Sequence, residues 1–284
     1  WEAFQELAER VSDLIFNKFI REGKFSYKLF IERETITHQI DGFLESEKRC
    51  LILVADSGMG KTNLFCNMER RLSSEKHAVF FLYGREYEGG GIDTFIMKHL
   101  RLKDSFFKRS FEYGFMEVLR LISQDDAINN KKKVVLLIDA VNEYDFPELL
   151  LNEIINFVEN VDYPFFKVIF SIRTFTWENL HDKFIFDNNI YYQKKTGKDT
   201  KEPCLRLEKF TSQEFDQAFL QYKDHYKIKN DHLNEELKKT LANPLLLRFA
   251  CEAYQGEMLP ESVFPAMIFE QYKKERISQN DYLF

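Results

Sequence analysis

Four nearly continuous apolar runs dominate the hydrophobic pattern of the chain. They extend over Cys50 to Ala55, Ala78 to Tyr83, Val134 to Ile138 and Lys167 to Ile172, and a fifth, shorter run covers Cys204 to Leu207. Strands that are covered by helices on both faces have this pattern. Because helical patterns separate the runs, the sequence predicts βαβ units and a parallel sheet of about five strands.

The segments between these runs have apolar residues at three- and four-residue spacing, which is typical of amphipathic helices. The predicted helices are Lys61 to Ser74, Asp93 to Leu102, Glu112 to Asn129 and Pro147 to Glu159. Residues 1 to 20 have the same spacing, so they form either a helix packed on the core or a linker from an upstream domain. A short helix is expected to end near Leu44, and Glu88 to Gly91 is expected to be a flexible loop.

From about Lys209 onward the pattern is helical only. Thr211 to Glu214 reads as a capping box at the start of a helix. Asn243 and Pro244 predict a second helix start, with asparagine as the cap and proline as the first residue. A third helix is expected over Ser262 to Ser278. This part of the chain is therefore predicted to be a small all-helical subdomain.

The segment Ala55 to Thr62, ADSGMGKT, lies between the first strand and the helix that follows it. It matches the phosphate-binding pattern G-x-x-x-x-G-K-[ST] except at its first position. Gly58 and Gly60 allow backbone N–H groups to approach a polyphosphate, and the next helix points its positive end at the same place. Lys61 can reach the outer phosphates, and the Thr62 hydroxyl is placed to bind Mg²⁺. Alanine at the first position fits only if its φ is negative; the alternative is a glycine-rich turn that binds nothing.

Three charged residues follow later strands and complete a candidate nucleotide site. Asp139 ends the third apolar run, where an acid on a parallel strand beside the loop can hold the hydration shell of Mg²⁺. Glu143 can orient or deprotonate an attacking water. Arg173 ends the fourth run, at the carboxyl edge where ligands collect, and can sense or stabilise γ-phosphate charge. The alternatives are a capping aspartate, a solvated glutamate at a helix start and an arginine in a salt bridge.

Composition narrows the classes of partner. The formal net charge is −6 and the pI is about 5.7, so the chain has no general field for a polyanion and no direct nucleic-acid binding is expected. Lys131 to Lys133 is the obvious local basic patch, and it is interpreted as a solvated loop. No apolar run is long enough to span a membrane, and no signal peptide is recognisable. The first residue is Trp1, so we expect a piece of a longer, cytoplasmic protein.

The cysteines point to the same compartment. No two of them have metal-ligand spacing, and they lie mostly within apolar stretches, so they are expected to be reduced core residues. They are Cys50, Cys66, Cys204 and Cys251.

Together these motifs resemble, in the same order, those of the STAND NTPases, the signal-transduction ATPases with numerous domains, and most closely their NACHT-like branch. The matching segments are Ala55 to Thr62, Leu137 to Glu143, Phe170 to Arg173 and Leu241 to Leu247, with Phe30 to Glu34 similar to an Arg-Glu motif ahead of the first core strand. The resemblance covers residues from about 30 to 280.

The resemblance implies a nucleotide-binding domain followed by a helical domain, with ADP or ATP held between them. It implies that Arg173 is a sensor, that Pro244 lies against the adenine or ribose, and that Arg33 lies near the base. Such proteins are switches that exchange ADP for ATP and self-associate to activate an attached effector, in bacteria often in anti-phage defence. The sensor and effector domains would lie outside this chain. Ala55 and Asn142, which stands where many NACHT members have aspartate, are departures that leave the hydrolysis rate open.

The sequence therefore predicts an α/β fold of the P-loop NTPase type: a three-layer αβα arrangement with a central parallel sheet of about five strands and a small all-helical subdomain. The expected domains are 1–29 (helix or linker), 30–208 (nucleotide binding) and 209–284 (helical). The cofactors are ATP or ADP and Mg²⁺, with slow hydrolysis expected. Two further hypotheses are a nucleotide-dependent scaffold with negligible turnover and a P-loop kinase or AAA-like ATPase.

The candidate residues fall into three groups. The catalytic group is Asp139, Glu143 and Arg173, and the metal ligands are Thr62 and Asp139. The nucleotide-binding group is Ala55, Asp56, Ser57, Gly58, Met59, Gly60, Lys61, Thr62 and Asn63, together with Arg33 and Pro244.

Overall fold

The chain divides into two units, which are described separately. The computed structural model describes residues 1–100, 114–129, 131–184, 189–194, 201–262 and 264–274. Among these residues, contacts group 1–25, 35–56 and 61–207 into a first unit, and 26–34, 57–60 and the residues from 208 onward into a second.

The first unit is built on a five-stranded sheet with the order β2-β3-β4-β1-β7. All four pairings between neighbouring strands are parallel. The strands are β1 (Cys50–Ala55), β2 (Ala78–Tyr83), β3 (Val134–Asp139), β4 (Phe166–Arg173) and β7 (Leu205–Arg206). Every residue of the first three is buried, as expected for strands with helices on both faces.

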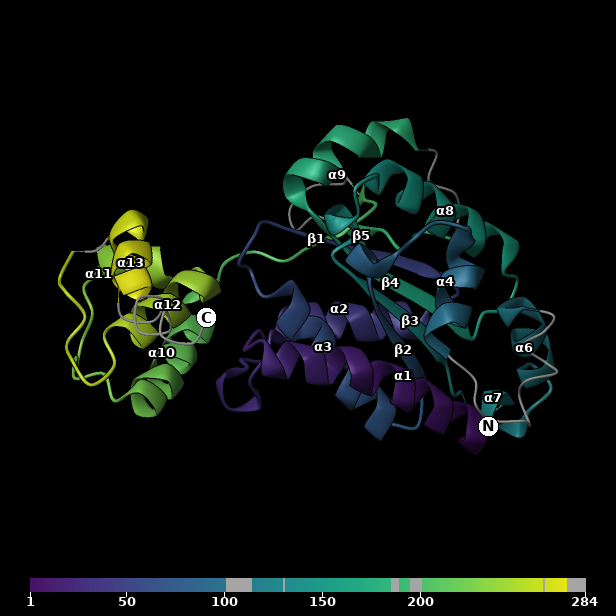
Figure 1. The fold of residues 1–284 in the computed structure, drawn as a ribbon, viewed down its shortest axis with the longest axis horizontal. Coiled ribbons are helices and arrows are strands. Elements are labelled where there is room, and N and C mark those ends of the chain that lie inside the picture. Colours follow the sequence, from purple (N-terminus) through teal and green to yellow (C-terminus); the bar gives the residue numbers. More distant parts are fainter. Residues whose placement is uncertain (101–113, 130, 185–188, 195–200, 263, 275–284) are drawn as a thin grey trace, which may run out of the picture. The chain divides into compact units, whose positions relative to one another are not determined.

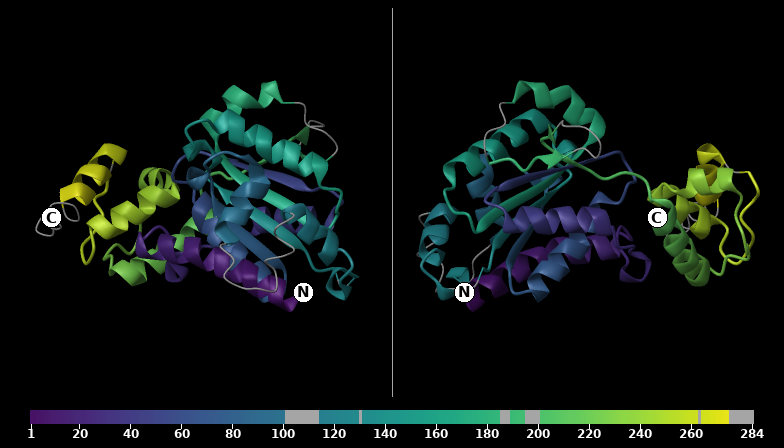
Figure 2. Two further views of the ribbon diagram at one scale, coloured as in Figure 1. Left: turned by 45° about the vertical axis from the view of Figure 1, so that its right-hand side comes forward. Right: turned by 180° about the vertical axis from the view of Figure 1, so that it is seen from behind.

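Helices cover both faces of the sheet. Figure 1 shows α2 and α3 on one side and α4 and α8 on the other, and the view from behind in Figure 2 agrees. The helices of this unit are α1 (Glu2–Arg21), α2 (Glu34–Glu45), α3 (Lys61–Ser74), α4 (Gly91–Leu100), α6 (Phe115–Ile122), α7 (Asp126–Asn129), α8 (Pro147–Asn160) and α9 (Thr174–Leu180). Short 3-10 helices are η2 (Gly84–Glu86), η3 (Val141–Glu143) and η4 (His181–Lys183). The predicted three-layer α/β fold with a parallel sheet is confirmed.

Helix α1 packs along the outer edge of β2. The buried Ser12 hydroxyl donates to the carbonyl oxygen of Val79 (2.7 Å) and accepts from the N–H of Phe81 (2.9 Å). It thereby satisfies two backbone groups that an edge strand would otherwise leave unpaired. Phe4 of α1 contacts the Phe80 ring, and Phe19 contacts the Phe81 ring. Because neighbouring strand residues point to opposite faces, α1 contributes to the core on both sides of β2.

Two details of the sequence-based assignment differ from the structure. The segment predicted as one helix from Glu112 to Asn129 forms two helices, α6 and α7, because a turn intervenes in which the N–H of Asp125 donates to the carbonyl of Ile122 (2.8 Å). Serine and aspartate in this turn favour local bonds over a continuous helix. A two-stranded antiparallel ribbon, β5 (Gln193–Lys194) and β6 (Lys201–Glu202), was not expected. Parts of three predicted helices, at 101–102, 112–113, 263 and 275–278, lie outside the described residues.

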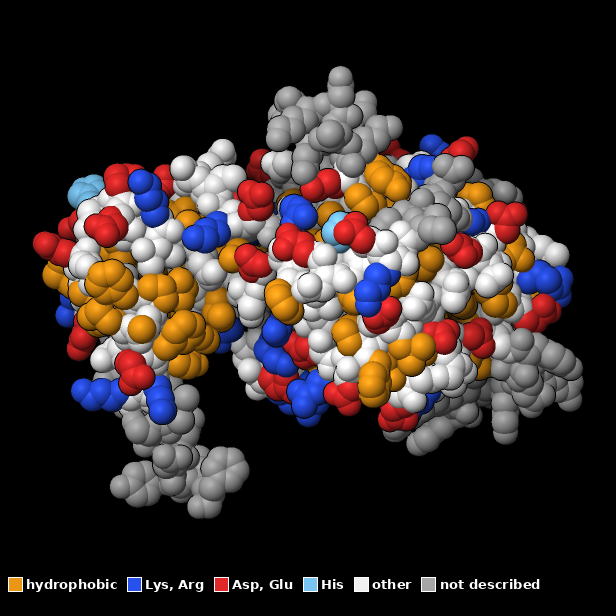
Figure 3. All heavy atoms as spheres, turned by 90° about the horizontal axis from the view of Figure 1, so that it is seen from above, with side chains coloured by type: hydrophobic (Ala, Val, Ile, Leu, Met, Phe, Trp, Pro, Cys, Tyr) orange, Lys and Arg blue, Asp and Glu red, His pale blue; other side chains and the backbone are white. Residues whose placement is uncertain are grey.

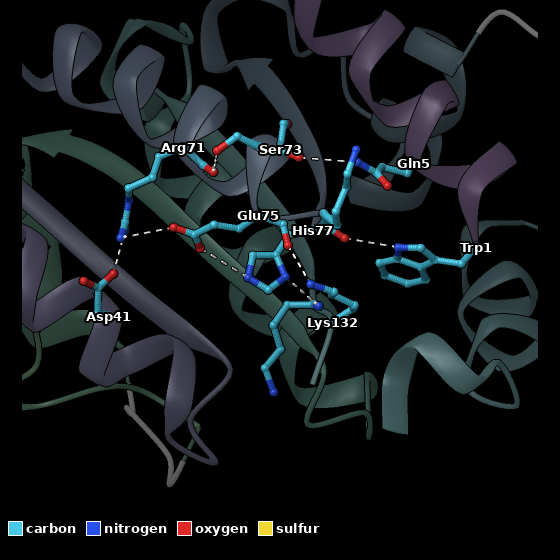
Figure 4. Close-up of polar contacts among 11 residues, drawn as sticks. Trp1, Gln5, Asp41, Arg71, Ser73, Glu75, His77 and Lys132 are labelled. Atoms are coloured by element: carbon cyan, nitrogen blue, oxygen red, sulfur yellow. Dashed lines mark hydrogen bonds and ion pairs between the residues drawn. The ribbon is translucent and has the colours of Figure 1, made fainter. Parts of the chain in front are cut away.

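The amino end of the sheet is held by a polar cluster that involves the lysine run (Figure 4). The N–H of Lys133 donates to Nδ1 of His77 (3.1 Å), and the Lys132 ammonium donates to the carbonyl of Glu75 (2.7 Å). Burial, with help from the nearby lysines and Arg71, lowers the pKa of His77 to about 4. His77 is therefore neutral near pH 7, and the cluster joins the loop before β3 to the end of α3. All four cysteines are buried and none forms a disulfide, as predicted.

Glu69 of α3 should make stability depend on pH. The residue is 5% exposed, and burial raises its pKa from 4.5 to about 7. The folded state therefore binds this proton more tightly than the unfolded chain, so the free energy of unfolding should fall as pH rises from about 4.5 towards 7, by at most about 3 kcal/mol. Glu69→Gln should stabilise the protein more at pH 8 than at pH 5 in urea unfolding. An equal effect at both pH values would contradict this origin.

The described residues of the second unit form four helices, three of which were predicted: α10 (Ser212–Tyr226), α11 (Glu235–Leu241), α12 (Pro244–Ala253) and α13 (Pro265–Tyr272), with η1 (Tyr27–Leu29). Thr211 forms the expected capping box with Glu214, and Asn243 caps α12 through the N–H groups of Leu245 and Leu246. Helix α11 was missed.

Apolar side chains gather on the surface of this unit (Figure 3), where Met258, Phe264, Met267 and Phe269 are exposed. No helix in the described part of the chain is both long and apolar enough to cross a membrane.

Candidate functional site

The first loop position lies within the sheet. Ala55 is the last residue of β1 and pairs with Arg173 in the parallel register with β4. It is not among the non-glycine residues with positive φ. Its backbone is thus extended, which any residue adopts without strain, and alanine meets the condition that the sequence imposed on it.

The two loop glycines are required by the backbone. Gly58 and Gly60 have φ values of +81° and +91°, in the left-handed region that favours glycine. A Cβ at Gly58 would also lie 2.8 Å from the Cβ of Leu245, which belongs to the same unit. The Leu245 N–H, one residue after Pro244, donates to the Gly58 carbonyl at 3.2 Å. Gly58 therefore serves both the turn and this close approach.

The Lys61 side chain folds back over the start of the loop. Its ammonium donates to the carbonyl oxygens of Ala55 (2.8 Å) and Asp56 (2.9 Å). Burial lowers the pKa of Lys61 to about 8, and the negative charge of Asp139 opposes this shift. Lys61 therefore remains charged at pH 7 and lies at the first residue of α3, next to the N–H groups that open that helix.

Asp139 is held from two sides. The Thr62 hydroxyl donates to its Oδ2 (2.6 Å) and the Ser171 hydroxyl donates to its Oδ1 (2.5 Å). The Ala140 N–H in turn donates to the Ser171 oxygen (2.8 Å). Burial raises the pKa of the fully buried Asp139, while the two hydroxyl hydrogen bonds and Lys61 oppose that shift. Strand β4 lies between β1 and β3, so the acid reaches the loop across the strand that carries Ser171.

These groups fit a magnesium ion. Thr62 and Asp139 present oxygen atoms 2.6 Å apart, and Mg²⁺ is bound through one or two protein oxygens together with water and phosphate. The described residues contain no cluster of three or more histidine, cysteine, aspartate or glutamate side chains that could hold a metal by themselves. A site with two protein ligands is therefore suited to an ion that arrives with a phosphate ligand.

Glu143 lies at the same edge of the sheet. Its Oε2 accepts a short hydrogen bond from the Tyr83 hydroxyl, and its Oε1 lies 3.7 Å from Nη2 of Arg173. Tyr83 ends β2 and pairs in register with Asp139. The structure thus brings together Lys61, Thr62, Asp139, Glu143 and Arg173 at the carboxyl ends of three neighbouring strands, β3, β4 and β1.

The turn after β3 has an unusual backbone. Ala140 has φ +56° and ψ +51°, a left-handed conformation that costs a non-glycine residue roughly 1–2 kcal/mol. It redirects the chain into η3, which carries Glu143. The Asn142 side chain accepts from the N–H of Arg173 (3.0 Å). Asn142 thereby fixes the end of β4.

The other candidate residues differ in their burial and in their hydrogen-bond partners. Arg33 is buried in the second unit, where it pairs with Glu214 (3.0 Å) and donates to the carbonyls of Glu208 (2.8 Å) and Lys209 (3.1 Å). Asn63 has a buried Oδ1 without a hydrogen-bond partner among the described residues. Of the loop residues, Met59 is buried, whereas Asp56 and Ser57 are exposed.

The sequence-based set missed Tyr83 and Ser171. Tyr83 is the last residue of a fully buried strand, so the reasoning that selected Asp139 at a strand end would also have selected it. Ser171 lies inside β4, two residues before Arg173. Its role depends on the strand order, which is not encoded in any local pattern.

No protein-family model matches the sequence, and no curated protein matches it either. Among solved structures, the fold is similar to a RuvB variant from Thermotoga maritima (12% identity, 86% of this chain and 70% of that chain covered, TM-score 0.42). It is similar to the Aeropyrum pernix ORC1 protein in complex with DNA (14%, 89% and 67%, TM-score 0.46) and to the S. cerevisiae Hsp104-ADP complex (15%, 94% and 34%, TM-score 0.45). At such low identities and TM-scores, the likeness carries no conclusion about the function of this chain.

Proposed function

We propose that this chain is the nucleotide-binding core of a STAND-type signal-transduction NTPase that binds ATP and ADP with Mg²⁺ and hydrolyses ATP slowly. The observation that carries the proposal is the hydrogen bond between Thr62, directly after the loop lysine, and the buried Asp139 at the end of β3 (2.6 Å). In the longer protein, nucleotide state would govern opening, self-association and the activity of an effector in defence or signalling. The motif order supports this finer assignment.

Phosphate binding would use the loop and α3. Gly60, where an added Cβ would meet no heavy atom within 4 Å, leaves room for a phosphate chain, and the positive end of the 14-residue helix α3 favours negative charge there. Lys61 can exchange its two carbonyl acceptors for phosphate oxygens without moving its backbone, since its long side chain rotates freely about four bonds. Phosphate would also favour the charged form of this lysine.

The bound Mg²⁺ would neutralise part of the phosphate charge. The Thr62 hydroxyl and Asp139 would hold it, directly or through its water. Ser171 keeps the carboxylate in one orientation through its 2.5 Å hydrogen bond. Glu143 would orient or deprotonate the attacking water, and Arg173, whose side chain is 49% exposed, would respond to γ-phosphate charge.

A nucleotide-dependent scaffold with negligible turnover is the second candidate. It is favoured by the state of Glu143, whose two oxygens face the Tyr83 hydroxyl and the Arg173 guanidinium. An attacking water would therefore have to share these oxygens with the hydroxyl and the guanidinium. The two candidates share the same binding site and differ only in the rate of hydrolysis.

Binding should appear as thermal stabilisation. At 100 times its dissociation constant a nucleotide adds ~2.7 kcal/mol to the free energy of unfolding, so MgADP and MgATP should raise the melting temperature by several degrees. ADP released by denaturing the purified protein would support the switch. No shift with either nucleotide would overturn the proposed function, and an empty site with fast basal turnover would count against the switch.

A further inference from the structure

Tyr83 lies between the N-terminal helix and the carboxylate of Glu143. Its side chain is buried, and its hydroxyl is in a short hydrogen bond with Oε2 of Glu143. Burial first, and then the carboxylate, raise the pKa of Tyr83 above its ordinary value. The hydroxyl therefore keeps its proton near pH 7 and is the donor in this bond.

The other carboxylate oxygen of Glu143 faces the opposite direction. Its Oε1 lies 3.7 Å from Nη2 of Arg173 at the end of β4, whereas Tyr83 approaches from β2. A hydrogen bond from the end of β2 and an ion pair from the end of β4 thus hold the two oxygens of the carboxylate. A carboxylate accepts about four hydrogen bonds, so positions for a water molecule remain on the same two oxygens.

A glycine makes the approach of Tyr83 possible. Gly84 follows Tyr83 and packs directly against the turn after β3: a Cβ there would lie 2.8 Å from the carbonyl oxygen of Ala140 and 2.9 Å from the Cα of Val141. Both neighbours are backbone atoms, which cannot rotate away. Only a residue without a side chain allows η2 and η3 to lie this close, and that proximity sets the reach of the Tyr83 hydroxyl.

Helix α1 holds the Tyr83 ring from the other side. The Phe19 ring meets it edge-on, with centroids 5.3 Å apart and planes at 88°. The ammonium groups of Lys18 and Lys24 each lie 5.4 Å from its centroid, within the range of cation–π attraction. Phe19 is itself fully buried. The ring therefore has a fixed position that depends on the last turn of α1.

We propose that Tyr83 is a positioning residue for Glu143 and that α1, through Phe19, holds Tyr83 in place. This inference rests on the proposed function, since it requires that Glu143 acts on water during ATP hydrolysis. It makes the rate of hydrolysis sensitive to a helix that ends 34 residues before the phosphate loop, at Arg21 against Ala55.

Tyr83→Phe tests whether Tyr83 positions Glu143. It keeps the ring and removes the donor, so kcat for MgATP should fall roughly tenfold because a misplaced base is less effective, while KM and the MgADP melting shift stay unchanged. In a Glu143→Gln background the same substitution should have no further effect. The matched control is Tyr87→Phe, which removes a hydroxyl that accepts from the N–H of Gly91 (3.0 Å) and should leave kcat unchanged.

The possible outcomes distinguish a failure of the proposed function from a failure of the positioning role alone. Loss of the MgADP shift in the wild-type protein, or no measurable turnover, would overturn the proposed function as a hydrolase and this inference with it. Intact binding and turnover with an unchanged kcat in Tyr83→Phe would overturn only the positioning role. A full tenfold loss that persists in the Glu143→Gln background would also overturn it, because the effect would then not pass through Glu143.

Phe19→Leu tests whether α1 holds Tyr83 in place. The matched control is Phe16→Leu, because Phe16 is a buried phenylalanine of the same helix that packs on the Phe25 ring, with centroids 5.5 Å apart. Both variants lose similar buried area, so their melting temperatures should fall alike. Only Phe19→Leu should lower kcat, by a few fold, and this loss should vanish in a Tyr83→Phe background. Equal kcat values for the two leucine variants would overturn the role of α1.

Discussion

Lys61→Ala is expected to abolish the melting shift with MgADP and MgATP. The Lys61 ammonium is placed inside the loop by the carbonyls of Ala55 (2.8 Å) and Asp56 (2.9 Å), where a β- or γ-phosphate would take their place. Burial lowers the pKa of Lys61 to about 8, so it carries its charge at pH 7. Removing a charge-assisted contact in a partly buried site costs about 1.5–3 kcal/mol for each hydrogen bond, which would weaken binding by orders of magnitude.

The matched control is Lys132→Ala. Lys132 also donates to a backbone carbonyl, that of Glu75 (2.7 Å), but at the amino end of the sheet (Figure 4). This variant should keep the full nucleotide shift. Without nucleotide, Lys61→Ala should melt close to the wild type, since water can take the place of the ammonium at the two carbonyls. A normal shift in Lys61→Ala, measured by differential scanning fluorimetry over a range of nucleotide concentrations, would show that the loop does not bind phosphate.

The central strands could be predicted because burial on both faces makes them nearly uniform in composition. Strands β1 and β2 have the bounds read from the sequence, β3 extends by one residue at its carboxyl end, and β4 extends by one residue at each end. The two-residue strands β5 and β6 carry no measurable periodicity, and helix α11 has only Leu237 and Leu241 buried. Elements this short are determined by tertiary contacts, which a local pattern does not contain.

Only those residues of the candidate site that stand next to a single predicted strand or loop could be predicted from the sequence. The loop glycines, Lys61, Thr62 and Asp139 follow from residue types next to predicted elements. The order of the strands does not, and that order places Ser171 against Asp139 and Tyr83 against Glu143. The φ of Ala55 could not be predicted from the sequence either. Ala55 takes part in the pairing of β1 with β4, and alanine fits this extended backbone.

Glu143→Gln is expected to leave nucleotide binding intact and to slow hydrolysis. A general base contributes 10²–10⁴-fold in typical enzymes, so kcat for MgATP should fall within that range if Glu143 deprotonates the water. Glutamine keeps the size and can still accept from the Tyr83 hydroxyl, but it cannot take up a proton. Because Glu143 is 31% exposed, the loss of its ion pair with Arg173 (3.7 Å) should change stability little.

Single-turnover hydrolysis with enzyme in excess over MgATP measures this step apart from product release. Glu148→Gln is the matched control, because Glu148 lies in the first turn of α8, a few residues later, and pairs with Lys183 (2.8 Å) at the surface. It should hydrolyse ATP as the wild type does. Unchanged hydrolysis in Glu143→Gln, with binding intact, would remove Glu143 from the catalytic residues. The hydrogen bond from Tyr83 would then be structural, and the scaffold would become the better reading of a site that binds nucleotide through Lys61, Thr62 and Asp139.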